Sequence, residues 1–299
     1  MRLAALVVAA AFAQAPFTTP PEIDYRQADI WSEGTRMSAE VFAPRSPAGK
    51  ILPTILMAHG WGGVKASLRP DAVVFARAGY LVVTFDYRGW GESDARGGKF
   101  HGQAQEVREV VDPLDFGADW LNAIHWVAGE PQCDIHRLGL WGSSFSGGLV
   151  VWAAARDERV RATHSQVPAL DGRWVIGSDA ERRRTYAEAT RRARGEIGYP
   201  PPGATAIGKL KGVPIRARFM DYAPVEDIQR APHCAMQFVI AEREELVDNR
   251  EHGIKAYERA RGPKNLVTIP RITHYGIYLE ARERAQRLAV EWFDKHLKN

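Results

Sequence analysis

One short segment of the sequence combines a predicted turn of small residues with three serine hydroxyls. Residues 138–141 are apolar and predict a buried strand, and Gly142, Ser143, Ser144 and Ser146 follow it before an apolar stretch that predicts a helix. A nucleophile on a sharp strand-to-helix turn needs small neighbours two positions away, because its backbone is strained there. Ser144 has Gly142 and Ser146 at those positions, although Ser146 stands where the G-x-S-x-G motif has glycine. Ser144 is therefore the predicted nucleophile, and Ser143 and Ser146 are the alternatives.

A serine hydroxyl is a poor nucleophile until a base takes its proton. His274 is the best placed of the nine histidines, because it follows the last predicted strand by a short loop and precedes the last predicted helix. The imidazole needs an acid that fixes its tautomer and stabilises its charge. The loop after the predicted strand 236–241 carries Glu244 three positions past the strand end, and Glu245 and Asp248 are alternatives.

Another predicted strand end is rich in glycine. The strand 54–58 stops at residues 59–63, which read His-Gly-Trp-Gly-Gly. Attack on a carbonyl creates an oxyanion that needs preorganised donors, and glycines let backbone N–H groups turn toward a cleft. The expected donors are the amides of Trp61 and of Phe145, the residue after the nucleophile.

Two further tryptophans stand where a substrate pocket is expected. Trp90 lies on residues 86–93, after the predicted strand 80–85, and Trp174 lies in a long segment without strands. Together with Trp61, these side chains are expected to line the pocket. Residues 86–93 are expected to shape the site. They form no G-x-G-x-x-G motif and no Walker lysine follows them, so no nucleotide site is predicted.

The elements that would position these residues alternate along the chain. A hairpin is predicted from residues 25–31 and 37–42, with Glu33 and Gly34 at its turn. Buried strands follow at 54–58, 80–85, 138–141, 162–167, 236–241 and 266–269. Helical periodicity lies between them at 71–78, 115–127, 147–155, 251–260 and 281–297. This alternation predicts a doubly wound α/β fold with a mostly parallel sheet and helices on both faces.

Residues 168–232 interrupt the alternation because they contain no good buried strand. Ser178 and Glu181 form a capping box for a helix that Gly195 would end, and a proline-rich stretch follows. We predict a small helical cap here, inserted between the sixth and seventh strands of a single domain at 16–299.

Composition excludes several classes of protein. The chain has 299 residues, 45% hydrophobic and 25% charged, as in an ordinary globular enzyme. Its two cysteines, Cys133 and Cys234, exclude a disulfide-rich scaffold and a four-cysteine metal site, and neither a metal nor a cofactor is predicted. The net charge of +4 is too small to indicate nucleic acid, although residues 171–218 hold eleven basic and five acidic side chains. That local excess is either a solvated helix face or a means of steering an anionic substrate.

The N-terminal residues have the pattern of an export signal. A basic residue precedes an apolar run of 11 residues at 3–13, and residues 13–15 read Ala-Gln-Ala, a cleavage pattern. The run is too short for a membrane span, which needs roughly 20 residues, and Pro16 is unfavourable for cleavage before it. We predict a signal peptide at 1–15 and a secreted or periplasmic protein, or a cytoplasmic one if the segment is not a signal. Export would permit a disulfide between the two cysteines without establishing one.

These motifs resemble the α/β-hydrolase superfamily over nearly the whole chain, in the bacterial branch near dienelactone hydrolases and the X-prolyl dipeptidyl peptidase/cocaine esterase group. The segments that carry the resemblance are His59-Gly60-Trp61-Gly62-Gly63, Phe85-Asp86-Tyr87-Arg88-Gly89-Trp90-Gly91, Trp141-Gly142-Ser143-Ser144-Phe145-Ser146-Gly147-Gly148 and His274-Tyr275-Gly276-Ile277-Tyr278. The resemblance implies a triad of Ser144, Glu244 and His274, in that chain order, and an eight-stranded sheet whose first strands are antiparallel. Many members have Asp where this chain has Glu244. The extra β domain of the X-prolyl peptidases has no counterpart here, which argues against proline specificity.

The function expected from these residues is hydrolysis of carboxylic esters through an acyl-enzyme, with a small-molecule substrate and no cofactor. An amidase or peptidase would use the same residues, because ester and amide hydrolysis differ in the pocket. A catalytically inactive hydrolase fold that serves as a binding module is the alternative from another class.

Overall fold

The computed structural model describes residues 17–45, 49–95, 98–100, 103–105, 110–198 and 213–298. The predicted signal peptide at 1–15 lies outside these ranges, so export and the location of the protein stay predictions. No helix within the described ranges is long and apolar enough to cross a membrane.

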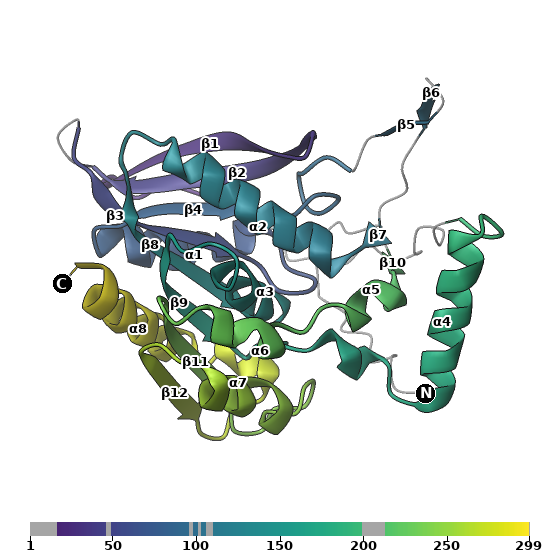
Figure 1. The fold of residues 1–299 in the computed structure, drawn as a ribbon. Coiled ribbons are helices and arrows are strands. Elements are labelled where there is room, and N and C mark those ends of the chain that lie inside the picture. The colour runs from purple at the N-terminus through teal and green to yellow at the C-terminus, as the bar shows by residue number, and fades with distance from the viewer. Residues whose placement is uncertain are drawn as a thin grey trace.

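Eight strands form one twisted sheet (Figure 1). They are β1 (Ile23–Ser32), β2 (Thr35–Pro44), β3 (Leu52–Ala58), β4 (Leu81–Phe85), β8 (Cys133–Ser143), β9 (Val160–Gln166), β11 (Ala235–Ala241) and β12 (Lys264–Ile269). The spatial order is β1-β2-β4-β3-β8-β9-β11-β12. Strand β2 is antiparallel to β1 and β4, and the other neighbours are parallel. The predicted fold is confirmed, with the antiparallel pairs at the N-terminal edge.

The first hairpin shows why a local pattern was sufficient to predict it. Ser32 pairs with Thr35, so Glu33 and Gly34 form a two-residue turn. Both have positive φ, 47° and 83°, which is the backbone of the turn that matches strand twist in tight hairpins. Glycine adopts this conformation without strain.

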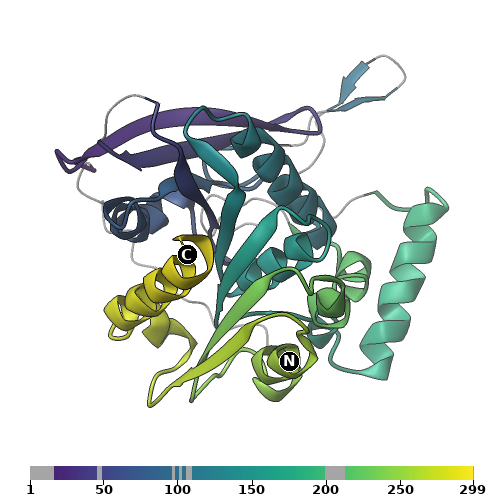
Figure 2. The same cartoon turned by 60° about the vertical axis from the view of Figure 1, so that its left-hand side comes forward.

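Helices cover both faces of the sheet, as Figure 2 shows for α1 and α8 on one side and α2 on the other. One core layer packs α1 (Arg69–Arg77) and α8 (Arg282–Phe293) against the sheet. The opposite layer is built from α2 (Pro113–Ala128), α3 (Phe145–Ala154), α6 (Pro224–Asp227) and α7 (Lys255–Arg259). Parallel strands buried on both faces explain the apolar runs seen in the sequence.

Short elements complete the described chain. They are η1 (Lys65–Leu68), η2 (Gly172–Val175), η3 (Ile228–Arg230), η5 (His274–Tyr278), the π-helical η4 (Arg250–Ile254) and η6 (Asp294–Lys298), and the strand pairs β5 (Gly98–Phe100) with β6 (Gln103–Gln105) and β7 (Val110–Val111) with β10 (Val213–Pro214).

The segment predicted as a cap runs between β9 and β11 and contains η2, α4 (Asp179–Ala193), β10, α5 (Arg216–Met220), α6 and η3. The Oγ of Ser178 accepts a hydrogen bond of 3.2 Å from the amide of Glu181, and Gly195 has a φ of +73°, so the predicted helix start and end are both confirmed. Helix α4 stands apart from the body (Figures 1 and 2), and Thr185 is its one buried residue.

Both cysteines are free thiols. The disulfide that export would permit is therefore not formed in this structure. Cys234 is buried, and burial raises the pKa of its thiol to about 12, so it is neither ionised nor reactive near neutral pH.

Candidate active site

Ser144 stands on the turn between β8 and α3, in a backbone conformation that side-chain-bearing residues rarely adopt. Its φ is 58° and its ψ is −119°, and its amide is held by the carbonyl of Gln166 at 2.9 Å. A Cβ at Gly142 would lie 2.3 Å from the carbonyl oxygen of Ser146, so this position requires glycine. The strained turn projects the Ser144 side chain from the carboxyl end of the sheet, as in a nucleophile elbow.

His274, on η5 after β12, lies between Ser144 and Glu244. Its Nε2 is 3.0 Å from the Oγ of Ser144, and its Nδ1 is 2.9 Å from both carboxylate oxygens of Glu244. The side chains of His274 and Glu244 are only 3% and 2% exposed. A carboxylate accepts from Nδ1–H, which leaves Nε2 as the nitrogen that accepts the hydroxyl proton. Three residues far apart in sequence thus form one hydrogen-bonded series.

The structure also distinguishes the three candidate acids. Only the Glu244 carboxylate, among the described acidic groups, bonds the His274 ring, and it also accepts from the Leu246 amide at 3.0 Å. The Glu245 carboxylate instead accepts from the backbone amide of His274 at 2.7 Å. Asp248 accepts from the amide of Arg250 at 2.8 Å. Glu245 therefore anchors the loop that bears the histidine, while Glu244 faces its ring.

The two alternative serines are held by tyrosines, of which Tyr87 is fully buried and Tyr278 is partly buried. The Oγ of Ser143 is 2.7 Å from the phenol of Tyr278, and the Oγ of Ser146 is 2.8 Å from the phenol of Tyr87. Burial raises the pKa of both phenols well above their usual range. Within the described part of the chain, the Nε2 of His274 bonds Ser144 and neither of these serines. Sequence reasoning missed both tyrosines, because nothing local shows which hydroxyls they meet.

The predicted oxyanion donors lie beside the elbow. A Cβ at Gly60 would lie 2.9 Å from the Cβ of Ser144, so the chain that carries Trp61 passes against the nucleophile. The Trp61 amide bonds no acceptor among the described residues. Phe145 is the first residue of α3, where N–H groups have no intrahelical acceptor and the helix dipole is positive.

Aromatic side chains form a wall next to these amides. Trp61 is 41% exposed, and its ring lies 5.7 Å from Trp90, 5.8 Å from Phe145 and 6.5 Å from Phe219. Trp90 is fully buried, so it supports the wall from behind Trp61. Trp174 is half exposed on η2. Phe219 was not predicted, because it reaches the wall from α5 only through tertiary packing.

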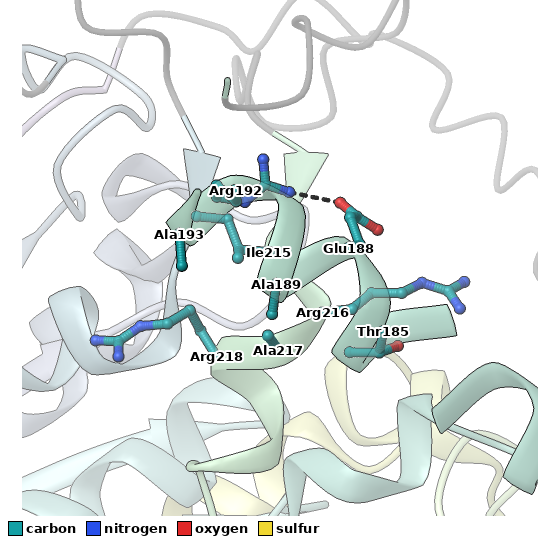
Figure 3. Close-up of a pocket in the computed structure, with 9 residues that line it drawn as sticks. All are labelled: Thr185, Glu188, Ala189, Arg192, Ala193, Ile215, Arg216, Ala217 and Arg218. Carbon is teal, nitrogen blue, oxygen red and sulfur yellow. Dashed lines mark hydrogen bonds and ion pairs between the residues drawn. The ribbon is translucent and has the colours of Figure 1, made fainter. Parts of the chain in front are cut away.

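A separate pocket of about 270 Å³ lies between α4 and α5 (Figure 3). It is lined by Thr185, Glu188, Ala189, Arg192, Ala193, Ile215, Arg216, Ala217 and Arg218. Its surface is mostly apolar, and its three arginines each have an acidic partner: Arg192 has Glu188 at 2.5 Å, Arg218 has Asp112 at 2.7 Å and Arg216 has Glu181 at 3.9 Å. It contains none of the residues of the Ser144 site. Among the described residues there is no group of His, Cys, Asp and Glu that could hold a metal ion.

Several known proteins are similar to this chain in sequence or in fold. The family model for X-Pro dipeptidyl-peptidase (S15 family) matches residues 33–178. An uncharacterized 31.7 kDa protein of Escherichia coli, from the traX-finO intergenic region, is 31% identical over 85% of this chain and 94% of its own length. The quorum-quenching protein AidA of Acinetobacter baumannii is 34% identical over 47% of this chain and 43% of its own. The crystal structure of a hypothetical protein of Pseudomonas aeruginosa has a TM-score of 0.77 at 21% identity and covers 94% of this chain and 96% of its own.

The sheet order, the strained turn at Ser144 and these similarities define an α/β-hydrolase-fold enzyme. The chain belongs to the α/β-hydrolase superfamily, and its residues 33–178 match the family of S15 peptidases.

Proposed function

We propose that this enzyme is a serine hydrolase that cleaves carboxylic esters through an acyl-enzyme. The observation that carries the proposal is the series from Ser144 through His274 to Glu244, with contacts of 3.0 and 2.9 Å. Such a series supplies a nucleophile, a base within hydrogen-bond reach and a group that orients the base.

In the first half-reaction the Oγ of Ser144 bonds the ester carbonyl carbon while its proton passes to Nε2 of His274. The carbonyl electron pair moves onto oxygen, where the amides of Trp61 and Phe145 donate hydrogen bonds to it. The carbonyl then reforms and the bond to the alkoxide oxygen breaks. The alkoxide takes the proton from the His274 imidazolium, whose charge Glu244 stabilises, and leaves as the alcohol.

Water completes the cycle. It attacks the acyl carbon and gives its proton to His274, and the collapse of the second tetrahedral intermediate releases the carboxylic acid and returns the proton to Ser144. The two half-reactions together consume one ester and one water molecule and release one alcohol and one carboxylic acid, and the enzyme returns to its starting protonation state.

The decisive experiment compares the wild type with Ser144→Ala on p-nitrophenyl esters from acetate to decanoate. The covalent route predicts a loss of kcat of about 10⁴-fold or more in this variant. Ser143→Ala is a matched control, since Ser143 bonds Tyr278 rather than His274, and should keep most of the activity. Equal rates for the wild type and Ser144→Ala would contradict the proposal. The dependence of the wild-type rate on acyl length measures the size of the acyl pocket.

Amide or peptide cleavage is a second candidate, because the match to the X-Pro dipeptidyl-peptidase family spans residues 33–178 and so includes Ser144. A p-nitroanilide series with and without proline before the scissile bond distinguishes it, since a peptidase would turn over anilides and an esterase would not. A fluorophosphonate probe reports on both candidates. Failure to label Ser144 would favour a binding module that performs no chemistry.

A further inference from the structure

One loop contacts both segments that carry the proposed oxyanion donors. This loop, residues 86–93, follows β4. Its first residue, Asp86, meets the chain around Trp61, and its second residue, Tyr87, meets the chain around Phe145. Neither contact involves the substrate, His274 or Ser144 directly. The contacts therefore bear on where the donors lie.

The carboxylate of Asp86 contacts both ends of the turn that bears Trp61. Its Oδ1 accepts from the backbone amide of Lys65 at 2.6 Å and lies 3.4 Å from the Nε2 of His59. The ammonium of Lys65 is 3.4 Å from the other carboxylate oxygen of Asp86 and 2.5 Å from Glu92. The side chains of His59, Lys65 and Asp86 are each only 1% exposed. One buried carboxylate thus accepts from the amide of residue 65 and lies against the ring of residue 59, and Trp61 stands between these two residues in the chain.

The electrostatic balance keeps this carboxylate charged. Burial alone opposes ionisation, but the neighbouring His59 imidazole and the charge of Lys65 outweigh it, so the pKa of Asp86 lies below its usual range. The loop also closes tightly on the group, since a Cβ at Gly91 would lie 2.2 Å from its Oδ2. A charged acceptor with several donors in a buried site makes strong hydrogen bonds.

Tyr87 contacts the other donor segment, the start of α3 that carries Phe145. The indole N–H of Trp120 donates to its phenol oxygen at 3.0 Å. The same phenol lies 2.8 Å from the Oγ of Ser146, and either of these two hydroxyls can donate the hydrogen bond between them. Ser146 follows Phe145 in the first turn of α3 and is fully buried. This bond gives a physical reason for serine at the position where the G-x-S-x-G motif has glycine.

We propose that Asp86 and Tyr87 are positioning residues of the oxyanion site, each holding one of the two segments whose amides, at Trp61 and Phe145, receive the developing negative charge. The inference rests on the proposed function. Donors are effective only within about 2.7–3.1 Å of the oxyanion, and a misplacement of about 1 Å costs on the order of 100-fold. Two adjacent residues in one loop therefore set the separation between the two donors.

The first test is Asp86→Asn, which keeps the shape of the side chain and removes its charge. We expect kcat on a p-nitrophenyl ester to fall by about 10- to 100-fold, with KM changed by less than about threefold. A phenylboronic acid forms a tetrahedral adduct on the nucleophile that occupies the oxyanion site, so its affinity should fall by a factor similar to that for kcat.

The matched control is Arg88→Lys in the same loop. Arg88 is buried, like Asp86, but it bonds Asp119 at 2.6 Å and Ser32 at 2.6 Å, away from the two donors. This variant should lower Tm at least as much as Asp86→Asn while kcat and boronate affinity stay near the wild-type values. Equal losses of kcat in the two variants would show a general structural effect and overturn the proposal.

A second test does not depend on the stability of Asp86→Asn. Tyr87→Phe removes one hydroxyl and should lower kcat severalfold, and Ser146→Ala should do the same. If the bond between them is what matters, the double variant should be no worse than either single variant. Wild-type kcat and boronate affinity in Tyr87→Phe, or strictly additive losses, would overturn the role of Tyr87. If instead Ser144→Ala is as active as the wild type, the proposed function itself fails.

Discussion

The carboxyl edge of the sheet and helix α4 hold their charged side chains in opposite ways. At the sheet edge, Glu244 and His274 are almost completely buried, and each is held at more than one atom. On α4, Arg182 and Arg184 are 56% and 76% exposed, and they approach acidic neighbours three residues away at 4.0 and 3.9 Å. Buried groups with several partners have one geometry, whereas exposed pairs are screened by water and contribute little. Chemistry that needs fixed distances is therefore expected at the first region and not at the second.

The largest expected loss of activity comes from breaking the hydrogen-bonded series of Ser144, His274 and Glu244. Glu244→Gln should lower kcat by about 10⁴-fold, because an amide can hold the imidazole in the wrong tautomer and does not stabilise its positive charge. Steady-state kinetics on a p-nitrophenyl ester measures the loss, and circular dichroism checks that the fold is kept.

Glu245→Gln is the control for that variant. Its carboxylate accepts from the backbone amide of His274, and a glutamine oxygen can accept the same bond, so kcat should stay within about tenfold of the wild type. If Glu245→Gln were the more damaging substitution, Glu244 would not be the residue that orients His274.

An intermediate effect is expected from a buried base in the sheet. His164 on β9 is fully buried, and burial lowers its pKa to about 4. A hydrogen bond of 2.7 Å between its Nδ1 and Gln237 acts in the opposite direction but does not offset the effect of burial. Between about pH 6.5 and 4 the unfolded chain takes up a proton here and the folded chain does not, so stability falls as pH falls through this window. A shift of this size corresponds to a loss on the order of 3 kcal/mol. Urea unfolding at pH 7, 6 and 5 measures it.

His164→Asn removes this titration and should flatten the dependence of unfolding free energy on pH. His136→Asn, at an exposed position, should leave the slope as in the wild type. An unchanged slope in His164→Asn would show that other groups cause the acid sensitivity.

The smallest effect is expected on α4. Replacing Arg182, Arg183 and Arg184 by glutamine should change the unfolding free energy by no more than about 0.5 kcal/mol per residue, as for other exposed ion pairs. Turnover of a neutral ester should be unchanged. Measuring kcat/KM for an anionic ester at low and high salt then separates the two interpretations of this charge. A loss confined to low salt would indicate steering, and no loss would indicate a solvated face.

The sequence by itself determined the features that depend on near neighbours. The hairpin turn at Glu33 and Gly34, the capping box at Ser178 and the apolar strands follow from backbone conformation and local burial, and the structure confirms them. The sequence also determined that Ser144 lies on a sharp turn between a strand and a helix. The small residues around it leave room for its strained backbone, and this pattern is visible locally. Strand ends and chain order were also enough to bring His274 to the correct edge of the sheet.

Only the tertiary structure decided which side chains meet across that edge. Glu244, Glu245 and Asp248 are alike in sequence, and the hydrogen bonds of the folded loop direct just one of them to the His274 ring. Residues 86–93 had no visible partner in the sequence, yet they contact segments on both sides of Ser144. Such contacts join residues more than twenty positions apart. Their geometry depends on how whole strands and helices pack, and no local pattern records that packing.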